Sequence, residues 1–424
     1  MIFHPFHYII NIGGKFMNEL MEKYASVLLE SCLRVEKDQP LFISFNIERI
    51  DFVRIVAKKA YSIGVKDIYF DMVDPILKHS ALENLEEEDL KKTTFWNKET
   101  WNTYAKKNAA FLMLASETPG LMKDIDSKKV SAMTKYMLTT RAYFDSMRDK
   151  QKLAWTIAAV PTEKWAQEVF KNSKNPLEDL WNQIFEICNI KEKNPVEIWN
   201  KKVEVLKRRA DKLNEYKFKS LKYESSNGTN FYIELPKEHI WQSAKESINN
   251  KDITVNYPTE EVFTSPDCKS ANGILYSSKP LVYQDVIIDE FYISFKDGKV
   301  EKFNAKTGND TLKEMINICK NSDMLGEVAL VPYDSPISNS NIVFLETLYD
   351  ENAACHIALG DSFPECFENG INMTKEELFE KNLNDCKSHI DFMIGTKDLK
   401  VTGTTHDNKE IPILIDGNFT EEFN

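Results

Sequence analysis

The 424-residue sequence is poor in the features that mark several large classes of protein. It contains only 14 glycines, and neither G-x-G-x-x-G nor G-x-x-x-x-G-K-[ST] occurs, so a loop that cradles phosphates is not indicated. No apolar run reaches the roughly 18 residues that a membrane-spanning helix needs. The seven cysteines are an odd number without a C-x-x-C pair, which favours free thiols in a reducing compartment over disulfides or a structural zinc site.

Positive charge is also in the minority. There are 54 Lys+Arg against 66 Asp+Glu, and the formal net charge is −12. Nucleic-acid binding needs a concentrated basic face, and no Lys/Arg stripe interleaved with aromatic residues occurs, so we expect no nucleic-acid partner. Hydrophobic residues (42%) and charged residues (28%) lie in the usual range for folded chains. The composition therefore predicts an acidic, soluble protein that does not enter a membrane.

The amino-terminal stretch MIFHPFHYIINIGGKF is apolar, but it has no basic segment in front and no small-residue cleavage site. A secretion signal is therefore not indicated. From Met17 onward apolar residues recur at helical spacing, which predicts an amphipathic helix to about residue 36. We expect residues 1–16 to be an extension of the folded chain and the protein to be cytoplasmic.

Short apolar runs alternate with helical sequence in the first half of the chain. The helix predicted over 49–63 should end at Gly64, where a left-handed cap is expected. A further helix is predicted around 126–146, and residues 163–217 have helical character throughout. Such alternation is typical of a parallel sheet covered by helices. The runs predicted as buried strands are Leu41–Phe45, Ile68–Phe70, Ala110–Leu114 and Leu153–Ile157.

From about residue 218 the pattern changes to short alternating strands and turns. Two of these strands flank Asn227-Gly228, a strong hairpin signal. We therefore predict an α/β N-terminal domain with a parallel sheet and a β-rich α+β C-terminal domain. The predicted division is 1–16 as extension, 17–217 as the α/β domain and 218–424 as the α+β domain. Within the α+β domain, strands are predicted at 285–289 and 291–295 and a helix at 309–321.

Acidic and imidazole side chains of the second half gather in four segments that also contain apolar residues. Each segment places a carboxylate or an imidazole at the start of an apolar strand or inside one. The segments are Pro258-Thr-Glu-Glu-Val-Phe-Thr-Ser-Pro266, Gly326-Glu-Val-Ala-Leu-Val331, Asp350-Glu-Asn-Ala-Ala-Cys-His-Ile-Ala-Leu-Gly360 and His389-Ile-Asp-Phe-Met-Ile-Gly395.

These side chains favour a metal site for a physical reason. A carboxylate or imidazole that enters an apolar strand loses several kcal/mol of hydration unless it is paired or binds a cation. His389 and Asp391 are two residues apart and so point to one face of a strand, the spacing that chelation needs. Taken singly, each residue is better explained as a solvated or ion-paired carboxylate or as a core histidine than as a metal ligand. Four such segments together favour a metal site, and both explanations remain open at this point.

The same segments resemble the M29 family of metallo-aminopeptidases, which comprises the aminopeptidase T, aminopeptidase S and PepS enzymes. The resemblance runs from about Met17 to the end of the chain. Its motifs are Asn256-Tyr-Pro-Thr-Glu-Glu-Val-Phe-Thr-Ser-Pro266, Gly326-Glu327, Ser335-Pro-Ile-Ser338, the Asp350–Gly360 and His389–Gly395 segments, Trp241-Gln-Ser-Ala244 and Asp416-Gly-Asn-Phe419.

The resemblance implies a site for two divalent metal ions, which are zinc, cobalt, magnesium or manganese. It implies that Glu261 ligates one metal, that Glu327 bridges both, and that Glu351 is an additional acid to be tested as general base. Glu260 is expected to be structural, because successive strand residues face opposite ways. The resemblance also implies a homodimer that acts on short peptides. The remaining metal ligands that it implies are His356, His389 and Asp391.

One position departs from the family pattern. The resemblance predicts a tyrosine close to the metals shortly after the His356–Gly360 segment, but Phe363 stands there. If that hydroxyl stabilises the oxyanion, its loss costs about 10²–10³ in rate, as for one oxyanion-hole donor. Tyr333 or a water is the candidate replacement.

Three hypotheses about function follow. The first is a metal-dependent aminopeptidase in which a metal-activated water removes the N-terminal residue of a short peptide. The second is an impaired relative that binds metals and peptides with little turnover because of Phe363. The third, a nucleotide-binding α/β protein, rests only on the alternation of strands and helices in the first half of the chain.

Overall fold

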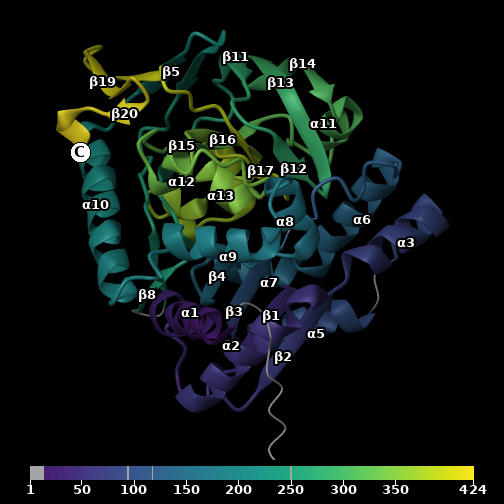
Figure 1. Ribbon diagram of the computed structural model, residues 1–424. Helices are drawn as coiled ribbons and strands as arrows, with labels where there is room; N and C mark the ends of the chain where they lie inside the picture. The colour runs from purple at the N-terminus through teal and green to yellow at the C-terminus, as the bar shows by residue number, and fades with distance from the viewer. Residues whose placement is uncertain (1–13, 93–94, 117, 249–250) are drawn as a thin grey trace, which may run out of the picture.

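The computed structural model describes residues 14–92, 95–116, 118–248 and 251–424. The expectation that residues 1–16 form an extension falls mostly outside these ranges. The first described helix, α1, begins at Gly14 rather than at Met17. Figure 1 shows the first half of the chain in purple and blue below the green and yellow second half, with α10 along one side of the molecule.

The first half of the chain is built around a parallel sheet with the strand order β2-β1-β3-β4-β9. Its strands have apolar residues on both faces, because helices cover both faces. On β1, Phe42 packs into a cluster with Trp101, Phe111 and Phe144, whereas Ile43 joins the main core. The strands are β1 (Leu41–Asn46), β2 (Ile68–Val73), β3 (Ala110–Ala115), β4 (Trp155–Ala159) and β9 (Asn256–Tyr257).

The helices of this half largely follow the predicted pattern. Helix α2 ends where Gly64 takes a φ of 106°, a left-handed conformation that glycine adopts without steric cost. The single helix predicted around 126–146 is two helices that meet at Arg141. The helices are α1 (Gly14–Ser26), a π-helix η1 (Val27–Cys32), α2 (Ile50–Ile63), α3 (Pro75–Asn84), α4 (Glu87–Leu90), α5 (Phe95–Lys106), α6 (Ser127–Thr140), α7 (Ala142–Asp149), α8 (Glu163–Val169), α9 (Pro176–Ile187) and α10 (Pro195–Tyr216).

The second half contains two larger antiparallel sheets and a hairpin. Nine strands form the first sheet, in the order β12-β13-β11-β6-β5-β18-β19-β20 with β14 on β13, and four form the second, in the order β10-β15-β16-β17. The strands are β5 (Ser220–Glu224), β6 (Asn230–Glu234), the hairpin β7 (Lys245–Ile248) and β8 (Lys251–Thr254), β10 (Val262–Thr264), β11 (Asn272–Tyr276), β12 (Leu281–Tyr283), β13 (Val286–Lys296), β14 (Lys299–Thr307), β15 (Leu325–Leu330), β16 (His356–Gly360), β17 (His389–Met393), β18 (Lys400–Thr404), β19 (Glu410–Ile415) and β20 (Asn418–Phe419).

The predicted fold class is confirmed: a parallel sheet with helices is followed by a β-rich region with short helices. The hairpin around Asn227-Gly228 is present, but the strands predicted at 285–289 and 291–295 are one strand, β13. The helix predicted at 309–321 ends at Ile316. The short helices of this half are α11 (Asn309–Ile316), α12 (Pro336–Asn339), α13 (Thr347–Glu351) and α14 (Lys375–Glu380).

The two halves of the chain share structure across the predicted domain boundary. Helix α10 ends at Tyr216 and β5 begins at Ser220, on either side of the predicted division after residue 217. Strand β9, however, comes from the second half and pairs in parallel with β4 of the first half. The division into residues 17–217 and 218–424 therefore stays a prediction.

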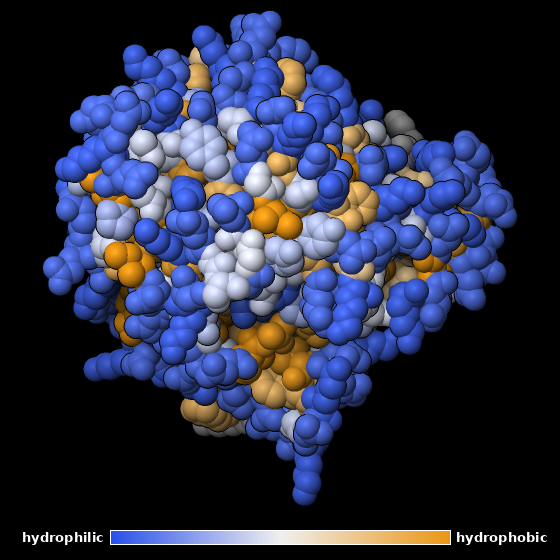
Figure 2. All heavy atoms as spheres, turned by 90° about the horizontal axis from the view of Figure 1, so that it is seen from above, coloured by the Kyte–Doolittle hydropathy of each residue, from blue (hydrophilic) through white to orange (hydrophobic). Residues whose placement is uncertain are grey.

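The visible surface is mainly polar and the cysteines are free thiols, as the composition indicated. The face seen in Figure 2 is mainly hydrophilic, with a few separate apolar areas. All seven cysteines lie in the described ranges, and each is a free thiol. Among the helices of the described residues, none combines the length and the apolar character needed to cross a membrane.

Candidate metal centre

Four strands of one sheet carry the candidate metal ligands. Glu261 directly precedes β10, Glu327 lies on β15, His356 begins β16, and His389 and Asp391 lie on β17. In the register of this sheet Glu327 pairs with Ala358, which pairs with Asp391, so these side chains project from the same face. Figure 1 shows these strands in the middle of the molecule, with α12 and α13 beside them.

The two faces of this sheet differ in size and polarity. Between the candidate ligands, the face that carries them has small residues, Ala329, Ala358 and Gly360. The opposite face packs into the main core, so the sheet gives the ligands a rigid support. The core residues on that face are Val328, Leu330, Ile357, Leu359, Ile390 and Phe392.

The ligand atoms form two groups that share one residue. Glu261, Glu327 and His356 offer atoms that all lie within 4.8 Å of one another, and so do Glu327, His389 and Asp391. His356 Nε2 lies 2.9 Å from Glu261 Oε2, and His389 Nε2 lies 3.0 Å from Glu327 Oε2. The structure thus brings together all five residues that the sequence proposed as ligands, with Glu327 between the two groups.

Main-chain carbonyls orient both imidazoles. His356 Nδ1 lies 3.0 Å from the carbonyl oxygen of Glu351, and His389 Nδ1 lies 2.8 Å from that of Asp361. Because a carbonyl can only accept, we assign the ring proton to Nδ1 in both residues. With a cation present, each Nε2 would be free to offer its lone pair to the ion, which is the usual arrangement of metal-binding histidines.

Burial and mutual repulsion dominate the electrostatics of the site. Burial, opposed by the hydrogen bond to His389 and aided by the charge of Asp391, raises the pKa of Glu327 to about 7. Burial, followed by the charges of Asp391 and Glu261, holds the pKa of Glu351 well above its ordinary value. Burial opposes protonation of His356, but hydrogen bonding to Glu261 together with the charges of the surrounding carboxylates outweighs it and holds the pKa of this imidazole high. The acids are therefore costly to ionise together unless a cation is added.

These residues fit a divalent cation in each group. Oδ1 of Asp391 is buried and makes no hydrogen bond in the described part of the chain, although His389 Nε2 lies 3.4 Å away. A bound cation would give this oxygen a partner and would lower the pKa of the neighbouring acids. Carboxylate oxygens and imidazole nitrogens suit zinc, cobalt, manganese and, when oxygen dominates, magnesium.

Glu260 and Glu351 have different places from the five ligands. Glu260 is buried and forms an ion pair with Lys202 of α10, as expected for a structural residue. Glu351 ends α13 and belongs to neither group, but it is buried and close enough to feel the charges of Asp391 and Glu261. Its position suits a proton carrier better than a ligand.

Asn352 is a residue of the site that the sequence reasoning did not single out. Its Oδ1 accepts hydrogen bonds from Thr259 Oγ1 (2.9 Å) and from the main-chain nitrogen of Glu260 (2.7 Å). Its Nδ2 donates to Glu351 Oε1 at 3.2 Å. Asn352 therefore ties the segment that carries Glu261 to the candidate base. The feature of the sequence that could have identified Asn352 is its place beside Glu351 in an otherwise apolar segment.

Phe363 lies beside the second group. Its ring centroid is 4.6 Å from that of His389 and 5.3 Å from that of Phe263, which faces the same side of the sheet. Phe363 therefore presents an apolar edge where the resemblance predicts a phenol. Tyr333, the proposed substitute, is 36% exposed and lines another pocket with Lys279 and Asn341.

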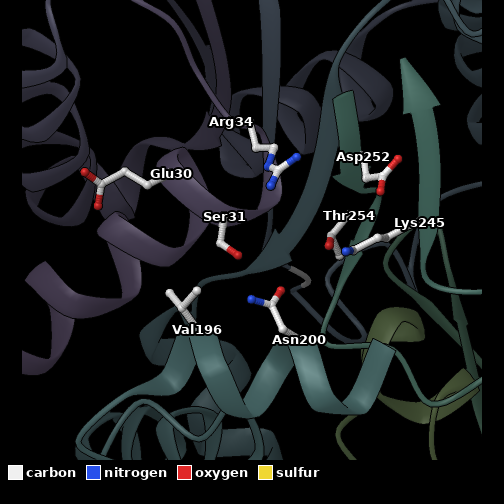
Figure 3. Close-up of a pocket in the computed structure, with 8 residues that line it drawn as sticks. All are labelled: Glu30, Ser31, Arg34, Val196, Asn200, Lys245, Asp252 and Thr254. Atoms are coloured by element: carbon white, nitrogen blue, oxygen red, sulfur yellow. The ribbon is translucent and has the colours of Figure 1, made fainter. Parts of the chain in front are cut away.

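A separate pocket lies between η1, α10 and the β7–β8 hairpin (Figure 3). Arg34, Asn200 and Lys245 point into it, whereas Glu30 points away. Its volume is about 120 Å³, which is below the range of several hundred Å³ usual for sites that enclose small molecules. Its lining includes none of the five candidate ligands, so it is not the site of the metal chemistry.

Comparisons with known proteins agree with the site. A family model described as thermophilic metalloprotease (M29) matches residues 17–419. Aminopeptidase 2 of Geobacillus stearothermophilus is 37% identical over 405 residues, which cover 95% of this chain and 98% of that protein. Aminopeptidase T of Thermus aquaticus is 29% identical over 404 residues, or 94% of this chain and 98% of that protein.

A solved structure is also similar to this chain. The structure of wild-type AmpT from Thermus thermophilus matches with a TM-score of 0.86 and 28% sequence identity, and the match covers 95% of this chain and all of that one. The likeness therefore extends over both halves of the fold and includes the sheet that carries the acidic and imidazole residues. Since the family model spans nearly the whole chain, the protein belongs to the M29 family of metallopeptidases, as its motifs predicted.

Proposed function

We propose that this protein is an aminopeptidase that removes the N-terminal residue from short peptides with the help of two divalent cations. The observation that carries the proposal is the position of Glu327, whose carboxylate belongs to both groups of ligand atoms. The relatives bear the name aminopeptidase, which supports the choice of substrate. The test is hydrolysis of leucine p-nitroanilide and leucyl peptides by protein loaded with zinc, cobalt, manganese or magnesium.

In this proposal each residue has a defined task. Glu261 and His356 would hold one cation, His389 and Asp391 would hold the other, and Glu327 would serve both. When bound, two such cations would lower the pKa of the attacking water and polarise the scissile carbonyl. Glu351 accepts the proton of that water and passes it to the leaving amine, while Asn352 Nδ2 holds Glu351 Oε1 in place.

Replacing Glu351 with Gln tests its role as general base. We expect kcat to fall about 10²–10⁴-fold, since that is the usual contribution of a positioned proton carrier. Metal content should stay at the wild-type value, because Glu351 belongs to neither ligand group. Steady-state kinetics and metal analysis of the purified variant give both numbers. A variant that turns over at the wild-type rate would remove Glu351 from the mechanism.

Replacing Phe363 with Tyr distinguishes an efficient enzyme from an impaired relative. If the missing hydroxyl limits turnover, the variant should gain about 10²–10³ in kcat, the contribution of one oxyanion-hole donor. We expect a small change instead, because relatives that match nearly the whole chain are named aminopeptidases. The equivalent change at Phe263, also to Tyr, is the control for adding a hydroxyl elsewhere on the same face.

Assembly and location are also part of the proposal. We propose a homodimer in the cytoplasm. Apolar side chains exposed at the end of the edge strand β2 and at the start of α3 support self-association, since such patches are costly to leave in water. These side chains are Met72 (59% exposed), Val73 (43%), Ile76 (44%) and Leu77 (68%).

A further inference from the structure

Asp361 is the residue whose main chain orients His389. It directly follows β16, and its carbonyl oxygen accepts the hydrogen bond from His389 Nδ1 at 2.8 Å. Its main-chain nitrogen donates to the carbonyl of Ser388 at 2.6 Å. A Cβ on Gly326 would lie 2.0 Å from this carbonyl oxygen, so only glycine leaves room for it. The direction of the His389 ring therefore depends on where the Asp361 peptide is held.

The side chain of Asp361 is held by a cation from another element. Lys375 Nζ lies 2.8 and 2.9 Å from its two carboxylate oxygens, and the two side chains are 33% and 14% exposed. The same Nζ lies 3.1 Å from Oδ2 of Asp149, the last residue of α7. Oδ1 of Asp149 in turn accepts from Arg148 Nη2 at 3.0 Å. A chain of ionic contacts thus runs from α7 in the first half of the chain to the carbonyl behind His389.

The placement of Lys375 is not explained by the stability of its own helix. It is the first residue of α14, whose start is fixed by a capping box between Thr374 and Glu377. A positive charge at this end of a helix is opposed by the helix dipole. The favourable contacts of Lys375 are the two carboxylates, and partly buried ion pairs contribute more to specific geometry than to net stability.

We propose that Lys375 is a positioning residue for the metal centre. By clamping Asp361 to Asp149, it fixes the carbonyl that aims His389 Nε2 at the second ligand group. The inference rests on the proposed metal site. It adds that a residue from the first half of the chain, Asp149, helps to fix the geometry of that site. Groups that orient a metal-binding histidine change metal affinity about 10–100-fold when removed.

The variant Lys375→Met tests the proposal, because it removes the charge and keeps the length of the side chain. Cobalt(II) affinity is measured by competition with a chelator, and the visible absorption of the cobalt(II) protein reports the ligand geometry. We expect affinity to fall about 10–100-fold for one of the two ions, with a changed absorption spectrum. The matched control is Lys59→Met, since Lys59 on α2 pairs with Glu30 at 2.9 Å and is 29% exposed.

A second variant keeps the test decisive if Lys375→Met does not fold. Asp149→Asn preserves the shape of the side chain and weakens the same clamp from the opposite half of the chain, so we expect a smaller loss of cobalt(II) affinity. In the double variant the two losses should not add, because both act through Asp361.

The outcomes separate this inference from the proposed function. If the wild-type protein binds cobalt(II) tightly and Lys375→Met and Asp149→Asn match it in affinity and spectrum, the positioning role is wrong. If the wild-type protein itself binds no divalent cation, the metal site is wrong and the inference falls with it.

Discussion

Removal of divalent cations with a chelator is expected to abolish peptide hydrolysis, and refilling with zinc, cobalt, manganese or magnesium should restore it. The physical reason is the close packing of Glu261, Glu327 and Asp391 beside His356 and His389. Bound cations would offset the repulsion among these carboxylates, and they would supply the positive charge that activates the attacking water and polarises the scissile carbonyl. The measurement is the rate of leucyl-peptide cleavage before stripping, after stripping and after each refill.

Stripping should also lower the melting temperature. A ligand that binds only the folded state at a thousand times its Kd stabilises that state by about 4 kcal/mol. Loss of the cations also leaves the buried carboxylates to repel one another. Calorimetry of the stripped and refilled protein provides the check, with mock-dialysed protein as control. Full activity in protein shown to be free of metal would contradict the proposed function.

Replacing Glu327 with Ala should reduce kcat/KM by more than about a thousandfold, because loss of even one preorganised donor costs about 10²–10³. Glu327 is the residue common to both ligand groups, so its removal weakens both at once. Replacing Asp391 with Asn should weaken only the group that contains His389. Metal analysis should therefore find less than one tightly bound ion in Glu327→Ala and about one in Asp391→Asn.

The control for these variants is Glu301→Ala, which removes an exposed carboxylate from strand β14. It should keep wild-type activity and metal content. Circular dichroism and the melting temperature establish whether Glu327→Ala is folded, and Glu327→Gln replaces it if it is not. Normal turnover by a folded variant at this position would mean that the shared carboxylate has been assigned wrongly.

Much of the site could be predicted from local sequence. His389 and Asp391 share a face because strand side chains alternate, and their strand was evident from its apolar run. Glu260 was separated from Glu261 by assuming that both lie in a strand, whereas both precede β10; the ion pair of Glu260 with Lys202 nevertheless gives it a partner of its own. The family motifs then identified Glu327 and His356 as partners. Local patterns sufficed here because each strand contributes its residues independently.

Much of the fold could also be predicted from local sequence. The apolar runs identified β1 to β4, the hairpin signal identified β5 and β6, and Gly64 marked the end of α2. The sequence did not indicate that β9 would cross the proposed boundary to pair with β4. A two-residue strand carries too little pattern to be recognised, and its partner is chosen by the packing of the whole sheet.

The sequence by itself determined the class of fold, the family and the identity of the acidic and imidazole residues. Only the tertiary structure decided that Asn352 joins Thr259 to Glu351 and that Lys375 links Asp361 to Asp149. These contacts join segments far apart in the chain. They depend on strand register and on where α7 and α14 lie in the fold, and no local periodicity encodes such distances.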